Sequence, residues 1–149
     1  MPEKETIERA RKDKREGKAP STQAGEFVRE EIEHVREGKH GARSTKQAIA
    51  IGLSKARRAG VKLPAPEKGE ASASTRRSAK QALKRGKSRK KPSAKRSRAA
   101  RAALKSAPHS TVSKKALSRQ ARTAARKRTA SERSASARKA ARTRARKTA

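Results

Sequence analysis

Large apolar side chains, which a folded core requires, are scarce in this chain of 149 residues. It contains one Phe and one Met, and no Trp, Tyr or Cys. Burial of one such side chain contributes about 2 kcal/mol, whereas ordering each residue costs ~1.5 kcal/mol. A core built from residues 1–63 is therefore marginal, and a second copy of the chain or a partner would add to it. The large apolar residues of that segment are Ile7, Phe27, Val28, Ile32, Val35, Ile49, Ile51, Leu53, Val61 and Leu63.

Charge divides the chain into two parts. Residues 1–63 contain 16 Lys/Arg and 10 Asp/Glu, a net charge of +6, whereas residues 64–149 contain 29 and 3, a net charge of +26. Pro64 and Pro66 stand at the change, where proline blocks helix continuation. We therefore predict a helical head (residues 1–63), a linker (64–70) and a basic tail (71–149).

Helix-capping residues predict two to three helices in the head, arranged as a helical hairpin. The first helix is expected over residues 5–16, ending at Gly17. The second begins at the capping residues Ser21 and Thr22 and runs to residue 37, with Gly38 beyond its end. Hydrophobic periodicity makes this second helix amphipathic.

The second helix carries an apolar stripe and an acidic stripe on opposite sides. Val28, Ile32 and Val35 share one stripe, with Phe27 beside it. The acidic stripe is predicted to be a solvated face, and its alternative is pairing with the chain's own tail or with a basic partner. It consists of Glu26, Glu30, Glu33 and Glu37.

The third helix begins at a capping box, Ser44-Thr45-Lys46-Gln47, and ends at Gly60, with Val61 placed for a Schellman ending. Ile49 and Leu53 lie on one face and Ile51 on nearly the other. Two apolar sides imply two neighbours: the second helix, and either the first helix or another chain. The residues predicted to form the head core or an interface are Phe27, Val28, Ile32, Val35, Ile49, Ile51 and Leu53.

Ala, Ser, Thr, Lys and Arg make up nearly all of the basic tail. Ala, Lys and Arg favour helix, but like charges three and four residues apart oppose it. Gly86, Pro92 and Pro108 interrupt any continuous helix. Low hydrophobicity with high net charge is typical of disorder, so we predict a largely disordered tail with transient helices that form on a polyanion.

The charge of the tail predicts its ligand. Lys and Arg that neutralise phosphates release condensed counterions, so binding needs no particular base sequence. We therefore expect sequence-independent binding of duplex DNA by phosphate neutralisation, and a nucleoid- or chromatin-associated role like that of a linker-histone tail. The predicted nucleic-acid-binding residues are Arg76, Arg77, Lys80, Lys84, Arg85, Lys87, Arg89, Lys90, Lys91, Lys95, Arg96, Arg98, Arg101, Lys105, Lys114, Lys115, Arg119, Arg122, Arg126, Lys127, Arg128, Arg138, Lys139, Arg142, Arg144, Arg146 and Lys147.

Two alternatives to DNA binding stay open. One is an RNA- or ribosome-associated basic protein, although single-stranded bases stack on aromatic side chains and the one Phe, Phe27, lies beside the apolar stripe and is assigned to the core. The other is a stress or interaction adaptor whose head binds a protein partner or a second copy of the chain. Sequence-specific reading by the third helix is disfavoured, because its cations Lys55, Arg57 and Arg58 cluster at the C-terminal end.

The sequence contains no residue pattern typical of an enzyme, a cofactor site, a metal site or a membrane span. No nucleophile with a base and no phosphate-binding glycine loop is present, so we expect no enzyme, no catalytic residue and no cofactor. His34, His40 and His109 are expected in solvent, and no metal ligand is predicted. No apolar run approaches the ~18 residues of a membrane span. We expect a cytoplasmic protein.

The segment STQAGEFVREEIEHVREGKHGARSTKQAIAIGLSKARRAGVKLP (residues 21–64) resembles a bacterial family of small basic proteins of unknown function. Members of that family often carry a histone-like tail. The stretches SKKALSRQAR (113–122) and RSASARKAARTRAR (133–146) are similar to such tails. The resemblance implies a bacterial, DNA-associated role and brings no catalytic residues.

Overall fold

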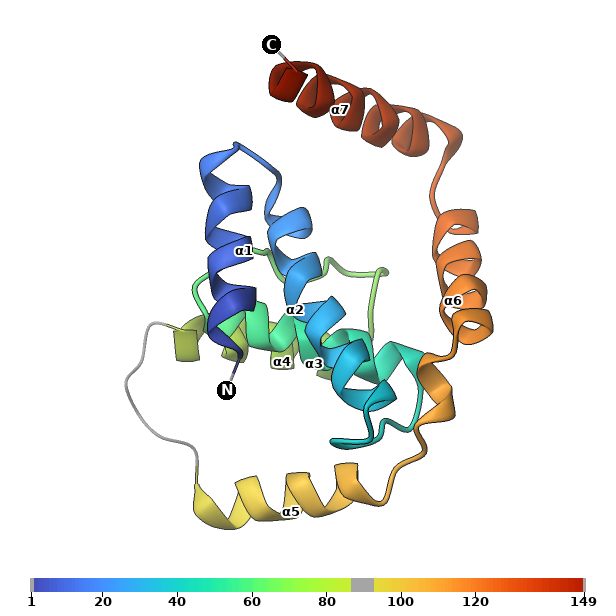
Figure 1. Ribbon diagram of the computed structural model, residues 1–149. Coiled ribbons are helices and arrows are strands. Elements are labelled where there is room, and N and C mark those ends of the chain that lie inside the picture. Colours follow the sequence, from blue (N-terminus) through green and yellow to red (C-terminus); the bar gives the residue numbers. More distant parts are fainter. Residues whose placement is uncertain (1, 87–92, 149) are drawn as a thin grey trace.

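A computed structural model describes residues 2–86 and 93–148, and most of this part of the chain is helical (Figure 1). Three helices precede the predicted linker, and the other helices follow it. The elements are α1 (Lys4–Arg15), α2 (Pro20–Arg36), α3 (Thr45–Arg58), α4 (Ala73–Gly86), α5 (Ala94–Lys105), the 3-10 turn η1 (Ser110–Val112), α6 (Lys114–Arg126) and α7 (Ala130–Thr148).

The first three helices all end at a glycine with positive φ. These glycines are Gly17 (φ 70°), Gly38 (φ 75°) and Gly60 (φ 95°). At the end of α3, the Val61 amide donates to the Ala56 carbonyl (3.1 Å) and the Gly60 amide to the Arg57 carbonyl (3.2 Å). This is the predicted Schellman ending, because glycine adopts the left-handed conformation without a steric penalty.

The helix starts follow the sequence less closely. α2 begins at Pro20, with Ala19 as its N-cap, so the predicted capping by Ser21 and Thr22 is wrong. Proline suits the first helical position because the amide that it lacks would have no partner there. At α3 the Ser44 hydroxyl accepts from the Gln47 amide as predicted (3.2 Å), but the Gln47 side chain accepts from the amide of residue 43 rather than from Ser44.

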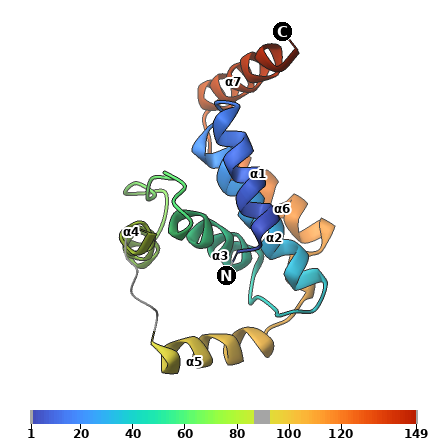
Figure 2. The ribbon, with the colours of Figure 1, turned by 60° about the vertical axis from the view of Figure 1, so that its left-hand side comes forward.

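The helices of the head pack around α2, which contacts both α1 and α3 (Figure 2). Gly52 allows the close crossing of α2 and α3, because a Cβ there would lie 2.6 Å from the Val28 Cα. One apolar cluster joins the three helices and the segment after α3. Its buried members are Ala10, Ala24, Phe27, Ala56 and Val61.

The second neighbour of α3 is α4, which comes from the basic tail. α4 lies alongside α3 and buries Ala79 and Ala82 (Figures 1 and 2). The expectation that α1 or another chain covers the second side of α3 is thus replaced by an intramolecular contact. The non-helical segment before α4 includes the predicted linker, residues 64–70.

A second apolar cluster ties a later part of the basic tail to the head. Val112 is fully buried with Val35, Ala42 and Ala48. Backbone hydrogen bonds reinforce this contact: the Gly41 amide donates to the Leu104 carbonyl (2.8 Å), and the Ala42 amide to the Pro108 carbonyl (3.0 Å). We call residues 104–112 the docking segment.

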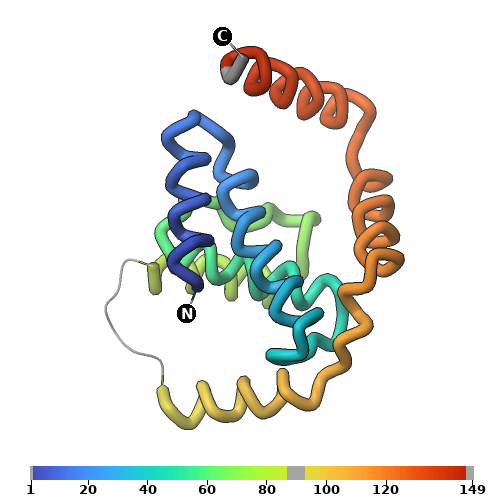
Figure 3. The backbone as a smooth tube through the Cα atoms, in the orientation of Figure 1, coloured from blue at the N-terminus to red at the C-terminus, as the bar shows by residue number. Residues whose placement is uncertain are grey.

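The predicted largely disordered tail with transient helices is wrong. α4 to α7 cover most of the described part of residues 71–149, as the backbone trace shows (Figure 3). Gly86 is the last residue of α4 and Pro108 lies between α5 and η1, so neither interrupts a helix, whereas Pro92 lies outside the described residues. Like-charge pairs on a helix surface cost only a few tenths of a kcal/mol each, and burial of Val112 and the α4 alanines opposes this cost.

Candidate nucleic-acid interface

Most of the predicted phosphate-binding cations lie on the surfaces of α4 to α7. Arg76 is partly buried, and the remaining described side chains of this set are exposed. Lys87, Arg89, Lys90 and Lys91 lie outside the described residues, as does the side chain of Lys147. The exposed members are Arg77, Lys80, Lys84 and Arg85 on α4; Lys95, Arg96, Arg98, Arg101 and Lys105 on α5; Lys114, Lys115, Arg119, Arg122 and Arg126 on α6; Lys127 and Arg128 after α6; and Arg138, Lys139, Arg142, Arg144 and Arg146 on α7.

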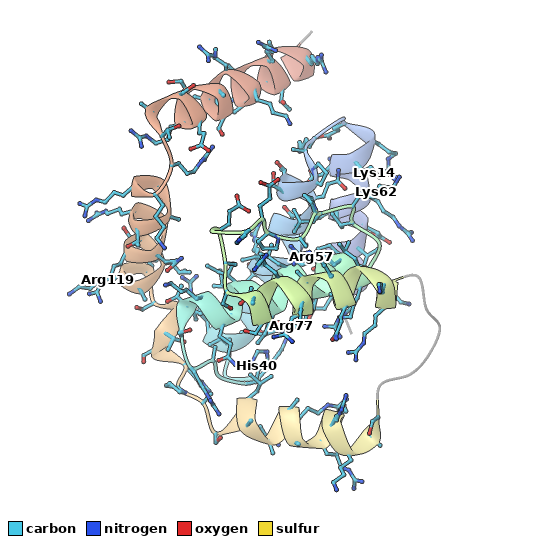
Figure 4. The ribbon with its side chains drawn as sticks, turned by 180° about the vertical axis from the view of Figure 1, so that it is seen from behind. Lys14, His40, Arg57, Lys62, Arg77 and Arg119 are labelled. Carbon is cyan, nitrogen blue, oxygen red and sulfur yellow. The ribbon has the colours of Figure 1, made fainter. Side chains whose placement is uncertain are left out.

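The most regular of these surfaces is on α6. Four of its exposed cations are spaced 4, 3 and 4 residues apart, so they share one face of the helix over about 16 Å. Together with Ser118 and Thr123 they line one shallow surface. In Figure 4 Arg119 points away from the rest of the molecule. We call Lys115, Arg119, Arg122 and Arg126 the α6 stripe.

The opposite face of α6 is partly buried in the N-terminal half of the helix. Leu117 and Gln120 lie on that face and are partly buried. The helix begins at Ser113, whose hydroxyl accepts from the Ala116 amide (3.3 Å), directly after the buried Val112. α6 also contacts α3 and η1. The α6 stripe is therefore presented to solvent by a helix anchored at its N-terminus.

Two arginines near the start of α7 have a structural role. The Arg128 guanidinium donates to the Glu132 carbonyl (3.0 Å) and to the Ser136 hydroxyl. Arg133, which was not among the predicted binding residues, donates to the carbonyls of Arg128 (2.5 Å) and Ala125 (3.4 Å). Both side chains thus join the end of α6 to the start of α7.

Glu132, the one acid of the basic tail, also has a local role. Its carboxylate accepts from the Thr129 amide (2.7 Å) and hydroxyl (3.0 Å), and the Glu132 amide donates to that hydroxyl (3.2 Å). This capping box lowers the pKa of Glu132, chiefly through the hydrogen bond from the Thr129 amide. The carboxylate is therefore occupied at the helix start.

Of the three cations at the C-terminal end of α3, Arg58 is exposed, whereas Lys55 and Arg57 have partners inside the head. Arg57 is 6% exposed and donates to the carbonyls of Leu63 (3.2 Å) and Pro64 (2.9 Å), and Figure 4 shows it between the helices. Burial lowers its pKa. Lys55 contacts the carboxylates of Glu30 (3.1 Å) and Glu31 (2.7 Å). The two side chains stabilise the head and are not free for phosphate.

The acidic stripe of α2 is only partly the solvated face that its spacing predicts. The side chains of Glu33 and Glu37 are 46% and 57% exposed, whereas Glu26 is partly buried. Glu30 is 2% exposed. Burial raises the pKa of Glu30, but hydrogen bonds from the Glu3 amide and from Lys55 outweigh it and hold that pKa below its ordinary value. Glu26 pairs with Arg9 (2.7 Å). The basic partners of Glu26 and Glu30 therefore come from α1 and α3 rather than from the tail, and Glu30 also accepts from the Glu3 amide.

The seven predicted core or interface residues divide by burial. Phe27 and Val35 are buried, at 1% and 0% exposure. The others are partly buried: Val28, Ile32, Ile49, Ile51 and Leu53. Part of this apolar surface is covered by the docking segment, because Ile32 packs on the cluster that contains Val112.

The prediction that the histidines of the head lie in solvent is wrong for His34 and His40. Side-chain exposure is 13% for His34 and 19% for His40. Both lie near the buried Glu31, three residues before His34 on α2. The Glu-x-x-His spacing was the signal in the sequence for this grouping, since residues three apart share a helix face.

The chain resembles a known family over its first part only. The model of a family of unknown function (DUF6496) matches residues 3–68, which contain α1 to α3. No curated protein and no solved structure matches the chain. The resemblance to a family of unknown function is thus supported, whereas the bacterial source and the histone-like tails of its members stay predictions. Within the described residues, none of the helices combines the length and apolar character needed to cross a membrane.

Proposed function

We propose that the protein binds duplex DNA without sequence preference, by neutralising backbone phosphates with the exposed cations of α4 to α7. The α6 stripe is the observation that carries this proposal. Its four cations lie in one row, on a helix whose opposite face is partly buried. Each phosphate neutralised releases counterions, and this release drives binding whatever the base sequence.

Helix dimensions favour DNA over duplex RNA. An α-helix with its side chains is about 10–12 Å across, and the major groove of B-DNA is about 12 Å wide. The major groove of A-form RNA is too deep and narrow to admit side chains. The α6 stripe therefore suits the phosphates that border a B-DNA major groove. This function would place the protein on the nucleoid, in agreement with the predicted cytoplasmic location.

The remaining tail helices enlarge the contact. The described part of residues 71–149 carries exposed Lys and Arg, and the single acid of this range, Glu132, is engaged in its capping box. By contrast, α1 carries Glu5, Glu8 and Asp13 among its cations. The proposal therefore assigns phosphate binding to the tail helices and not to α1.

Salt dependence tests the proposal. Affinity for a fluorescent 25-base-pair duplex is measured by anisotropy across a range of KCl concentrations. Replacing the α6 stripe by glutamine (K115Q/R119Q/R122Q/R126Q) should reduce the slope of log K against log salt by up to ~3.6, at ~0.9 per phosphate contact. The control R11Q/K12Q/K14Q/R15Q makes the same charge change on exposed positions of α1 and should reduce the slope by less than one.

Four results would contradict the proposal. One is a slope near one for the parent chain, and another is an equal slope change in both variants. The third is tighter binding of a duplex RNA of the same sequence at fixed salt, which would favour the RNA-associated alternative. The fourth is binding to neither nucleic acid, which would leave the adaptor hypothesis.

A further inference from the structure

A glutamate and two histidines meet where α2 ends and turns toward α3. Glu31 and His34 share a face of α2, and His40 lies in the turn that follows, as Figure 4 shows for His40. One carboxylate oxygen of Glu31 and one ring nitrogen of each histidine lie within 4.8 Å of one another. Two imidazoles with one carboxylate form a donor set found in zinc sites.

The hydrogen bond of His40 directs a free lone pair at Glu31. His40 Nδ1 lies 3.1 Å from the Gly41 carbonyl oxygen, which can only accept, so Nδ1 carries the hydrogen. In the neutral ring Nε2 then has a lone pair, and it lies 3.3 Å from Glu31 Oε1. Two electron-rich atoms this close require either a proton or a bound cation between them. Tetrahedral bonds of 2.0–2.1 Å separate neighbouring ligand atoms by about 3.3 Å.

His34 is oriented in a related way. Its Nε2 lies 2.9 Å from Glu3 Oε1, and an ionised carboxylate can only accept. The hydrogen bond fixes the orientation of the ring and leaves Nδ1 as its other nitrogen. A carboxylate behind an imidazole is the common outer contact of metal-binding histidines, because it orients the ring and increases its basicity.

The charge of Glu31 is only partly compensated. Its side chain is 1% exposed, and neither oxygen accepts a hydrogen bond of good geometry within the described part of the chain. Lys55 Nζ lies 2.7 Å from Oε2, but the same ammonium also contacts the buried carboxylate of Glu30 at 3.1 Å. One positive charge thus faces two buried negative charges. A buried charge without compensation is costly, and a divalent cation would remove this deficit.

We propose that Glu31, His34 and His40 bind a divalent transition-metal ion, with Zn²⁺ as the best match to the donor set. The ion would join the last turns of α2 to the turn that contacts the docking segment, since Gly41 directly follows His40 and bonds to Leu104. Metal binding would therefore stabilise the docked arrangement of α5 and α6 on the head. The proposal is independent of DNA binding.

The test uses the full chain without a histidine tag. Titration with Zn²⁺ by calorimetry should give one ion per chain, and Co²⁺ should produce the visible absorption bands of a four-coordinate site. His34→Gln and His40→Gln should each weaken Zn²⁺ binding by more than the ~10–100-fold that outer contacts usually contribute. Both side chains are partly exposed, so folding should tolerate the changes, and circular dichroism checks this.

His109→Gln is the matched control, because His109 is exposed and outside the group of three. It should leave Zn²⁺ binding unchanged. Zn²⁺ should also raise the thermal midpoint of the parent chain and of the control, but not that of the other two variants. Failure of the parent to bind Zn²⁺ stoichiometrically, or equal affinities in all the variants, would overturn the proposal. The group would then be explained by a protonated His40 paired with Glu31.

Discussion

Gly41→Ala should release the docking segment from the head. A Cβ at this position would lie 1.7 Å from the Ala107 carbonyl oxygen and 2.9 Å from that of Pro108. These neighbours are backbone atoms, so a side-chain rotation cannot relieve the contact. Gly41 is also not among the glycines with positive φ, so alanine adds no conformational strain of its own. The effect of the substitution therefore reports on the close approach alone.

The size of the effect follows from the distances. A carbon atom and a carbonyl oxygen normally stay about 3.3–3.6 Å apart, so the segments must separate by roughly 1.6–1.9 Å. This shift breaks the hydrogen bonds of Gly41 (2.8 Å) and Ala42 (3.0 Å) to the docking segment. At about 1 kcal/mol per hydrogen bond and about 1.5–3 kcal/mol for the buried Val112 side chain, the loss is about 3–5 kcal/mol. The docking equilibrium should fall roughly 100- to 4,000-fold.

Thiol labelling measures this equilibrium, because the natural chain contains no cysteine. Val112→Cys places one thiol in the buried cluster, and its reaction rate with a soluble disulfide reagent reports how often the segment opens. Addition of Gly41→Ala should raise that rate by the same factor, toward the rate of Ser113→Cys at a neighbouring exposed position. Gly25→Ala is the control, since a Cβ there meets nothing within 4 Å.

Two results would refute the reasoning. One is an equal labelling rate of the Val112→Cys thiol with and without Gly41→Ala. The other is a Val112→Cys thiol that, without Gly41→Ala, already reacts as fast as the thiol of Ser113→Cys.

Three further predictions concern the helices. Gly52→Ala should destabilise the head by about 1–2 kcal/mol, because the cost of overpacking against Val28 exceeds the gain in helix propensity. Gly25→Ala should stabilise it by about 0.5–1 kcal/mol, because a Cβ there meets no neighbour. Urea denaturation measures both changes in the free energy of unfolding, and changes of the same sign would contradict the close crossing of α2 and α3. Ser44→Ala should cost about 1 kcal/mol in the same assay through loss of the α3 cap. The capped Glu132 has a lowered pKa, so its contribution to α7 is present above the ordinary glutamate value and is lost as pH falls through the lowered one. NMR shifts of the first turn of α7 should follow this titration, and Glu132→Gln should remove it; an unchanged titration in that variant would assign it elsewhere.

Local features of the fold could be predicted from the sequence because their causes are local. Gly60 and Val61 give the Schellman ending of α3, and the Ser44 hydroxyl caps its start. The periodicity around Phe27 indicated an amphipathic helix, and that side chain is buried. The start of α2 was missed because Ser21 and Thr22 outweighed Pro20, although a proline at the first helical position is equally informative.

The candidate sites show a similar limit. The spacing of Lys115, Arg119, Arg122 and Arg126 was present in the sequence, but one exposed face exists only because α6 forms and is anchored after Val112. The composition of the basic tail favoured disorder, because composition reports how many large apolar residues a segment has but not which surfaces they pack against. The grouping of Glu31 with His40 depends on the turn after α2, whose path is held by bonds to residues more than sixty positions away.

The sequence by itself determined the excess of positive charge, its concentration after residue 63, and the C-terminal ends of the head helices, because charge and capping depend on neighbouring residues. Only the tertiary structure decided that the basic tail is helical, that Lys55 and Arg57 are inside, and that Val112 joins the head. Those outcomes depend on burial and on hydrogen bonds between distant segments. A few buried alanines and one buried valine are enough to pack the basic tail on the head, because Gly41 and Gly52 let the backbones approach closely. The α6 stripe therefore takes its charge from the sequence and its alignment from the fold.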